Sequence, residues 1–322
     1  MHVIHGFEHA PRPLRGAALA IGNFDGVHRG HQALLGATRS AAAARAAKSL
    51  AGVLIFEPHP RTVFQPERPH FELTPVQQKL ALLRRYGMDL TVIVPFNVAL
   101  AGLTAEAFVE RVLVAGLGVG HVVVGYDFHY GKGRVGTTES LKQAGRAYGF
   151  GVTIVDQIAD AGEIVSSSAI RTELAQGDVY GAAKMLGHWW RVGGVVRGGA
   201  KLGTGMGYPT ANTPLSPGTA LAHGIYAVRV YIDGARHEGA AYLGTRPTFD
   251  DGAAVLETFL FDFDQDLYGR EIEIEFVALI RGDRKFTGSG ALVKQMAIDC
   301  DQARGKLRAL DANDPFAWPL EA

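Results

Sequence analysis

Two histidines, His28 and His31, lie three positions apart between the apolar run 17–21 and an alanine-rich stretch with helical spacing. Free backbone N–H groups and the helix dipole at a helix N-terminus favour an anion. Imidazoles placed there can donate hydrogen bonds to a phosphoryl group. Glycines nearby let the backbone turn sharply and approach a ligand. The candidate phosphate-binding residues are Gly22, Asn23, Phe24, Asp25, Gly26, His28, Gly30 and His31.

This segment has neither of the two common nucleotide-binding patterns. It lacks G-x-x-x-x-G-K-[ST], which excludes a Walker-type loop, and G-x-G-x-x-G, which argues against dinucleotide binding of the dehydrogenase type. An isolated H-x-x-H pair is also compatible with two solvated histidines or a metal site. Its position behind glycines and directly after a predicted strand favours phosphate.

Three serines and an arginine form a second cluster, Ser166, Ser167, Ser168 and Arg171, where another predicted helix begins. Serine hydroxyls and helix N-terminal N–H groups can hold phosphate oxygens, and arginine adds a permanent positive charge. The alternative is an ordinary N-cap followed by a surface arginine. Together with the histidine segment, this cluster would form a triphosphate cradle.

Aromatic and polar residues follow two further predicted strands, in loops that line a site if the strands are parallel. They are Phe56, Pro58 and His59 after one strand and Asp127 and Phe128 after another. Aromatic rings there could stack on a flat ring system, and Asp127 could accept hydrogen bonds. The alternative is structural, with prolines that stiffen a loop and Phe56 in the core.

A glycine-rich run in the second half of the chain precedes the sequence Pro209-Thr210-Ala211-Asn212. Its Gly198, Gly203 and Gly207 could wrap phosphates with backbone N–H groups, and Lys201 would add a charge. Oxygens of Thr210 and Asn212 suit Mg²⁺. The alternative is a long flexible connection.

Two charged residues further along complete the candidates. Glu257 lies in a strand with apolar neighbours, so its carboxylate either faces solvent or is placed for chemistry. Arg284, after the last predicted strand, either meets a ligand or faces water.

The elements that position these residues differ between the two halves. Strands predicted at 17–21, 53–56, 90–94, 121–125 and 152–155 alternate with helices at 31–50, 75–86, 104–115 and 137–148. This βα alternation predicts a doubly wound parallel sheet with ligands at the carboxyl ends of its strands. Thr74 and Thr104 are the expected N-caps.

After two helices at 168–176 and 179–186, the chain reads as strands and turns. Strands are predicted at 191–197, 225–232, 238–243, 255–263 and 272–279, and a final helix at 289–310. The I-E-I-E-F sequence at 272–276 is typical of a strand with one wet face. We therefore predict an α/β protein with a parallel-sheet domain at 1–186 and a small antiparallel β-barrel with a final helix at 187–322.

Composition limits the class of protein. The chain has 322 residues, with 32 basic and 32 acidic side chains, so no excess charge drives binding to nucleic acid or acidic membranes. No apolar run is long enough to cross a membrane, and the first residues do not resemble a signal peptide. The single cysteine, Cys300, excludes an intramolecular disulfide framework. We expect a cytoplasmic protein that acts on small molecules, and its oligomeric state is not readable.

The motifs together resemble one family. G-N-F-D-G-V-H-R-G-H resembles the H-x-G-H signature of nucleotidyltransferases in the form found in bacterial bifunctional riboflavin kinase/FAD synthetases. S-S-S-A-I-R is similar to that family's S-S-T-x-I-R, F-E-P-H-P matches, and P-T-A-N is similar to the riboflavin kinase motif. The resemblance covers about residues 15–310.

The resemblance implies two activities: phosphorylation of riboflavin by ATP in the C-terminal domain, and adenylyl transfer from ATP to FMN in the N-terminal domain. His28, His31 and Arg171 would then act on the ATP phosphates, and Glu257 would be the general base of the kinase. Thr210 and Asn212 would hold Mg²⁺ with its nucleotide. The flavin would contact Phe56, Pro58, His59, Asp127, Phe128 and Arg284.

Two positions depart from the family pattern, Thr204 where arginine is usual and Arg197 where histidine is common. Both would lie near the nucleotide of the kinase site. Two alternatives therefore stay open. In one, only the adenylyltransferase is active, and in the other the chain is a non-catalytic flavin-sensing protein.

Overall fold

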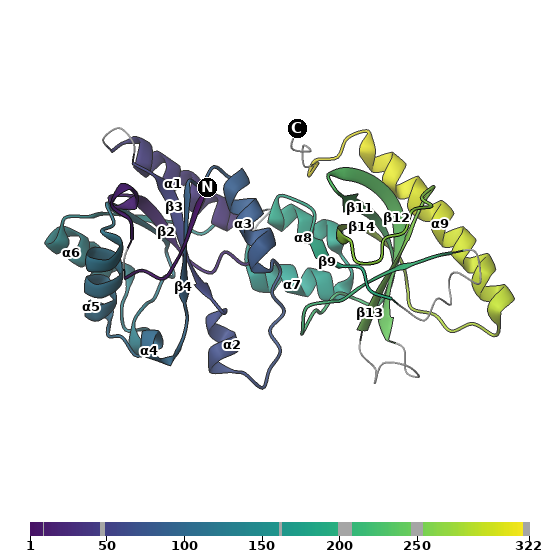
Figure 1. The fold of residues 1–322 in the computed structure, drawn as a ribbon, viewed down its shortest axis with the longest axis horizontal. Coiled ribbons are helices and arrows are strands. Elements are labelled where there is room, and N and C mark those ends of the chain that lie inside the picture. The colour runs from purple at the N-terminus through teal and green to yellow at the C-terminus, as the bar shows by residue number, and fades with distance from the viewer. Residues whose placement is uncertain (9, 46–48, 161–162, 199–207, 246–253, 318–322) are drawn as a thin grey trace. The chain divides into compact units, whose positions relative to one another are not determined.

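The fold was analysed in a computed structural model that describes residues 1–8, 10–45, 49–160, 163–198, 208–245 and 254–317. The chain forms two compact units (Figure 1). The first comprises Met1–His70 and Pro75–Ser166, and the second comprises Phe71–Thr74 and Ser167–Ala322. The two helices at 167–176 and 179–186 therefore belong to the second compact unit. The boundary between the functional domains at residue 186 stays a prediction.

Six parallel strands form the sheet of the described part of the first unit, in the order β1-β4-β3-β2-β5-β6. The predicted doubly wound parallel sheet is confirmed. The strand bounds are β1 His2–His5, β2 Ala18–Ile21, β3 Ala51–Glu57, β4 Leu90–Pro95, β5 His121–Gly125 and β6 Gly151–Val155.

The first strand was not predicted. β1 pairs with β4 at the edge of the sheet, and its sequence H-V-I-H is short and mostly exposed. Two polar ends around two apolar residues give no strand signal, and only pairing with the buried β4 makes this segment a strand.

Helices connect the strands and cover both faces of the sheet, with α5 and α6 on one side and α3 on the other (Figure 1). Thr104 caps α5 as predicted, since its hydroxyl accepts the Ala107 N–H at 3.1 Å. The N-cap of α3 is Pro75 and not Thr74. The α-helices are α1 Arg29–Ala43, α2 Pro60–Phe64, α3 Val76–Arg85, α4 Val98–Ala101, α5 Ala105–Ala107 and α6 Thr138–Tyr148. Helix α5 continues as a π-helix over Phe108–Leu117, and short 3₁₀ helices lie at Arg12–Leu14 and Lys132–Arg134. A separate two-stranded sheet consists of β7 Ala159–Asp160 and β8 Glu163–Ile164.

Six antiparallel strands form the sheet of the described part of the second unit, in the order β10-β13-β12-β11-β14-β9. Its outermost strands meet, because a Cβ on Gly194 of β9 would lie 3.0 Å from the Thr213 side chain of β10. The sheet is thus a nearly closed barrel, as predicted. The elements are α7 Ser167–Gln176, α8 Val179–Leu186, β9 Arg191–Val195, β10 Ala211–Thr213, β11 Gly224–Ile232, β12 Ala235–Thr245, β13 Ala254–Leu260, β14 Glu271–Gly282 and α9 Ser289–Asp311.

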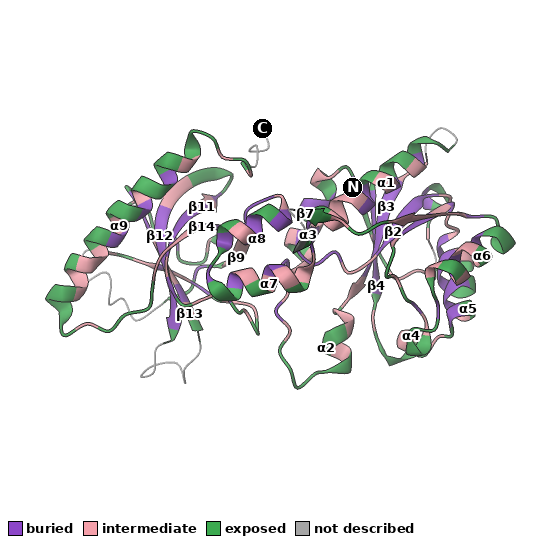
Figure 2. Cartoon of the chain, turned by 180° about the vertical axis from the view of Figure 1, so that it is seen from behind, coloured by how far each residue is buried: buried purple, intermediate pink, exposed green. Residues whose placement is uncertain are grey.

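The buried residues are concentrated in the strands of both sheets, and the helices show one buried and one exposed face (Figure 2). In β14 the apolar residues Ile272, Ile274 and Phe276 are buried as the alternation predicts. The prediction of a wet opposite face is wrong for Glu275, which is only 1% exposed.

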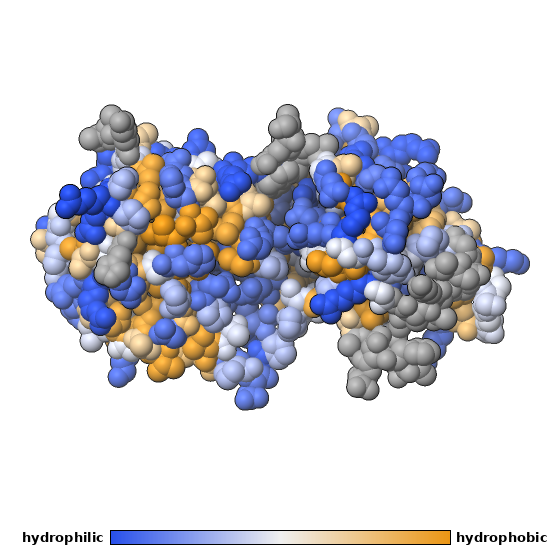
Figure 3. Space-filling model, viewed as in Figure 1, coloured by the Kyte–Doolittle hydropathy of each residue, from blue (hydrophilic) through white to orange (hydrophobic). Residues whose placement is uncertain are grey.

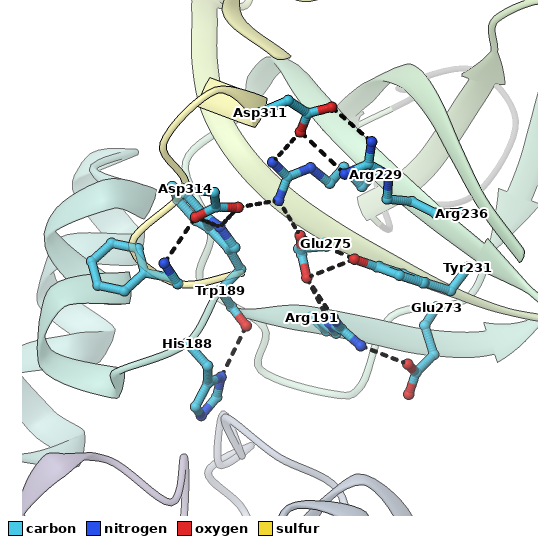
Figure 4. Close-up of polar contacts among 11 residues, drawn as sticks. His188, Trp189, Arg191, Arg229, Tyr231, Arg236, Glu273, Glu275, Asp311 and Asp314 are labelled. Atoms are coloured by element: carbon cyan, nitrogen blue, oxygen red, sulfur yellow. Dashed lines mark hydrogen bonds and ion pairs between the residues drawn. The ribbon is translucent and has the colours of Figure 1, made fainter. Parts of the chain in front are cut away.

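Glu275 is buried because two arginines neutralise it (Figure 4). Its carboxylate accepts from Arg191 Nη2 at 2.6 Å and from Arg229 Nη1 at 3.0 Å. Arg229 is itself 2% exposed and also pairs with Asp311 and Asp314. This network joins β9, β11 and β14 to the end of α9 and the residues that follow it.

Replacing Arg229 by Met should destabilise the second unit by about 3–5 kcal/mol, because the buried Glu275 would lose a counter-charge. Replacing Arg236, whose exposed side chain pairs with Asp311, should cost less than about 1 kcal/mol. Tryptophan fluorescence in a urea titration reports on this unit, since the buried Trp189 and Trp190 both lie in it. Equal effects of the two substitutions would contradict the network's role.

Candidate active sites

The histidine segment lies where the strand order of the first sheet reverses. From β2 the chain proceeds through β3 to β4 on one side, and then to β5 and β6 on the other. In open α/β sheets, ligands bind in the crevice at the carboxyl ends of the strands that flank such a reversal. The loop 22–28 leaves the carboxyl end of β2 at this point and leads into α1.

The backbone of this loop is held in an unusual conformation. Phe24 and Val27 both have positive φ, 49° and 41°, although neither is glycine. A β-branched residue in this region is a genuine outlier, and such strain persists only where the surrounding packing imposes it. Both side chains are fully buried. Phe24, predicted to contact nucleotide, therefore anchors the loop in the core, and its ring lies against His31 with centroids 5.0 Å apart.

The two histidine rings stack on each other at the start of α1, with centroids 3.7 Å apart and planes 18° apart. His28 is the N-cap, and its Nδ1 accepts the backbone N–H of His31 at 3.3 Å. The proton of a neutral His28 is consequently on Nε2, which is a hydrogen-bond donor. Gly30 permits this arrangement, because a Cβ there would lie 3.1 Å from the His28 ring.

His31 is held in its neutral form. Burial lowers its pKa well below the usual value near 6.5, and the charges of His28 and Lys79 lower it further. Its Nδ1 is buried and has no hydrogen-bond partner among the described residues. The N-terminus of α1 thus has ring nitrogens that could form hydrogen bonds to a negatively charged ligand.

The loop after β3 is tied to the histidine segment. The Nδ1 atom of His59 accepts the Arg61 N–H at 3.1 Å. The Nε2 atom of the same ring lies 3.2 Å from the amide nitrogen Nδ2 of Asn23. The structure brings together these two residues, which were predicted separately as nucleotide and flavin contacts. Pro58, between Glu57 and His59, is exposed.

Aromatic rings gather at the carboxyl ends of β3 and β4. Phe56 contacts Phe96 edge-on at 5.7 Å, and Phe96 contacts Phe64 of α2 at 5.6 Å. Phe64 is 65% exposed, and Val98 of α4 is 81% exposed. Figure 3 shows apolar residues at the same edge of this unit, where Figure 1 draws α4. Sequence reasoning found Phe56 but missed Phe96 and Phe64, whose only signal was their place after or beside a strand end.

The other predicted flavin contacts of this unit follow β5. Asp127 is exposed, and its backbone oxygen accepts from His129 Nδ1 at 2.8 Å. Phe128 is half-buried and stacks on Tyr130 at 5.6 Å. Glu57 is a further polar residue that the sequence reasoning did not select. Its Oε2 is buried and has no hydrogen-bond partner among the described residues.

The serine cluster lies at the division between the units. Ser166 ends the first unit, and Ser167 and Ser168 begin α7 of the second. Arg171 lies on α7, and its Nε donates to the Phe71 carbonyl at 2.6 Å. The predicted contact of these residues with phosphate stays a prediction.

The second unit brings the predicted kinase residues to one place. Asn212 of β10 lies opposite Glu257 of β13 in an antiparallel register, and the Thr210 hydroxyl donates to Glu257 Oε2 at 3.3 Å. Glu257 is half-buried, whereas its strand neighbours Leu256 and Thr258 are buried. Its carboxylate thus lies on the face of β13 that remains open in part to solvent.

The glycine-rich run lies partly outside the described residues. Arg197 pairs with Asn212 through a backbone hydrogen bond of 2.9 Å, and Gly198 is exposed. Lys201, Gly203, Thr204 and Gly207 lie outside the described residues. Arg284 is exposed, donates to Gln295 at 3.3 Å and lies near the Phe286 ring.

These features define a nucleotide-dependent transferase class, with one phosphate-type site on a parallel sheet and a second polar site on a barrel. The FAD synthetase family matches residues 10–169, and the riboflavin kinase family matches residues 186–307. A bifunctional riboflavin kinase/FMN adenylyltransferase of Pseudomonas fluorescens is 40% identical over 96% of this chain and 98% of its own. The Escherichia coli K12 protein of that name is 38% identical over 92% and 94%. The chain belongs to this bifunctional family.

A solved structure supports the arrangement of elements in the chain. A crystal structure described as a macrolide-efflux protein from Streptococcus pneumoniae superimposes with a TM-score of 0.81, at 28% identity over 94% of this chain and 98% of its own. Within the described ranges of the present chain, none of the helices is both long and apolar enough to traverse a membrane.

Stability of the first unit should fall on acidification because of His31. The pKa of His31 is lowered in the folded state. As pH falls below about 6.5, the unfolded state therefore binds a proton at His31 while the folded state stays unprotonated there. The loss between pH 7.5 and pH 5.5 should be on the order of 1 kcal/mol. Thermal unfolding followed by circular dichroism at both pH values should show a smaller acid loss in His31→Gln than in the wild type. An identical loss in both proteins would contradict the neutral state of His31.

Proposed function

We propose that this protein is a bifunctional flavin-cofactor enzyme. Its C-terminal domain phosphorylates riboflavin with ATP to give FMN and ADP, and its N-terminal domain transfers AMP from ATP to FMN to give FAD and pyrophosphate. The observation that carries the proposal is the stacked His28–His31 pair at the start of α1, at the reversal of strand order. The Thr210–Glu257 contact in the barrel supports the kinase.

Adenylyl transfer needs charge stabilisation more than proton transfer. An oxygen of the FMN phosphate attacks the α-phosphorus of ATP, and the bond from that phosphorus to the bridging oxygen breaks, so pyrophosphate leaves. The attacking phosphate is already ionised at neutral pH, so no general base is required. His28 Nε2–H, the neutral His31 and the α1 N-terminus supply donors to the charge that develops on the phosphate oxygens. The flavin ring lies against the aromatic rings at the β3 and β4 ends.

His28→Ala should lower the rate of FAD formation from FMN and ATP by about 10²–10³-fold, as expected for loss of one transition-state donor. Phosphorylation of riboflavin should keep its rate. Chromatographic separation of the flavins in two half-reaction assays measures both quantities. If FAD formation by His28→Ala matched that of the wild type, the assignment of this site would be wrong.

In the kinase, Glu257 accepts the proton of the riboflavin 5′-hydroxyl while that oxygen attacks the γ-phosphorus and ADP leaves. The half-buried position of Glu257 on β13 keeps the carboxylate reachable. Its hydrogen bond from Thr210 holds it in place. Arg284 and the glycine-rich run contribute flavin and phosphate contacts in this proposal.

The donor set around Glu257 fits Mg²⁺. Thr210 and Asn212 offer neutral oxygens next to a carboxylate, and Mg²⁺ takes few protein oxygens because it keeps waters and binds substrate phosphates. Thr210 and Asn212 would hold the ion. When bound, it would neutralise charge on the phosphates of ATP.

Glu257→Gln should reduce riboflavin phosphorylation by about 10²–10⁴-fold, the usual contribution of a general base, while FAD formation from supplied FMN continues. Glu271→Gln is the matched control, because Glu271 is exposed on β14 and its loss should change neither rate. A kinase that retains its full rate without Glu257 would eliminate the general-base role.

The alternatives are separated by the same assays on the wild-type chain. FMN that appears before FAD from riboflavin, Mg²⁺ and ATP establishes both activities. FAD formed only from supplied FMN leaves an adenylyltransferase alone and points to Thr204 and Arg197. Flavin binding without conversion indicates a sensor. We also propose a reducing, cytoplasmic location, because the single cysteine, Cys300, leaves the chain without an intramolecular disulfide.

A further inference from the structure

A lysine is buried in the first unit, and the described part of the chain offers it no counter-charge. Lys79 of α3 is 1% exposed and lies on the buried face of the helix with Leu82 and Leu83. Lysine is almost never fully buried unless it is paired. Within the described residues its amino group has no ion pair and no hydrogen bond. By contrast, Arg84 on the same helix is exposed, as is usual for a charged side chain.

The position of Lys79 in the fold points toward the adenylyl-transfer site. In the sequence, helix α3 comes between β3 and β4, and these two strands are adjacent and parallel in the sheet. A helix in such a crossover begins near the carboxyl edge of the sheet, where ligands bind. Lys79 is the fourth residue of α3, so it lies near that edge and not at the far end of the helix.

His31 is the neighbour that links Lys79 to the site. The positive charge of Lys79 is close enough to contribute to the lowered pKa of His31. His31 Nδ1 is buried and has no partner among the described residues. The buried cation on α3 thus acts on a ring at the start of α1 whose nitrogen lacks a partner among the described residues, and the dipole of α1 adds further positive potential there.

A buried ammonium without a counter-charge is unfavourable in the free protein. The arrangement is favourable only when an anion with several acceptor oxygens enters. We propose that Lys79 binds phosphate oxygens of the substrate in the adenylyl-transfer site, as a substrate-binding residue beside His31. This inference rests on the proposed adenylyltransferase function. The phosphate can belong to the triphosphate of ATP or to FMN.

The direct test is titration calorimetry of the full-length protein with inorganic pyrophosphate, the product of adenylyl transfer. Lys79→Met should weaken binding on the order of tenfold or more, since a charged hydrogen bond is lost. Lys79→Arg keeps the charge and should retain part of the affinity. Arg84→Met removes an exposed charge from the same helix and should bind like the wild type.

Kinetics then assign the phosphate. A raised KM for ATP in Lys79→Met, with an unchanged KM for FMN, places Lys79 on the triphosphate, and the reverse places it on FMN. Unchanged pyrophosphate affinity and unchanged KM values would overturn the proposal. So would a wild-type protein that does not bind pyrophosphate.

Stability separates a binding role from a structural one. Removal of an uncompensated buried charge should leave the melting temperature of the ligand-free protein unchanged or raised in Lys79→Met and Lys79→Gln. Unfolding of both variants would show a structural role and overturn the proposal. A wild-type protein that makes no FAD, but binds pyrophosphate through Lys79, would reject the proposed function and keep the anion site.

Discussion

The reversal of strand order between β2 and β5 is the constraint on which the first site depends. It leaves a crevice at one edge of the sheet, and the loop from β2 must turn there within a few residues. That turn is made with positive φ at Phe24 and Val27, and both side chains are anchored in the core. The packing therefore fixes where α1 begins, which in turn fixes His28 and His31. The core thus holds in place the strained backbone that positions the two histidines.

The barrel achieves the same result by strand register. Thr210 and Glu257 are far apart in sequence, and the antiparallel pairing of β10 with β13 places them in contact. The opposite part of the barrel carries the buried Arg229–Glu275 pair, which joins the strands to the end of α9. The two carboxylates of this domain differ in burial: Glu275 is buried in an ion-pair network, whereas Glu257 is half-buried and its carboxylate stays reachable from solvent.

Much of the fold could be predicted because its signals are local. Continuous β-branched runs gave the central parallel strands, and α8 and β5 have the bounds predicted. β1 and β10 were missed, since each is short and becomes a strand only through a partner. Glu275 was predicted to face solvent because the alternation of apolar and acidic residues shows which residues share a face of the strand. It does not show the arginines on neighbouring strands that pair with Glu275. Phe64 and Phe96 carry no motif, and only their convergence at a strand edge identifies them.

The sequence by itself determined the residue types that can do the chemistry, the two-part architecture and the family, because motifs and periodicity are properties of neighbouring residues. Tertiary structure alone decided protonation and proximity. His31 is neutral because of what surrounds it, His59 meets Asn23 because two loops share an edge, and Lys79 is buried although its own helix shows no unusual pattern. Desolvation and charge–charge interactions depend on distances through space, and spacing along the chain does not contain them.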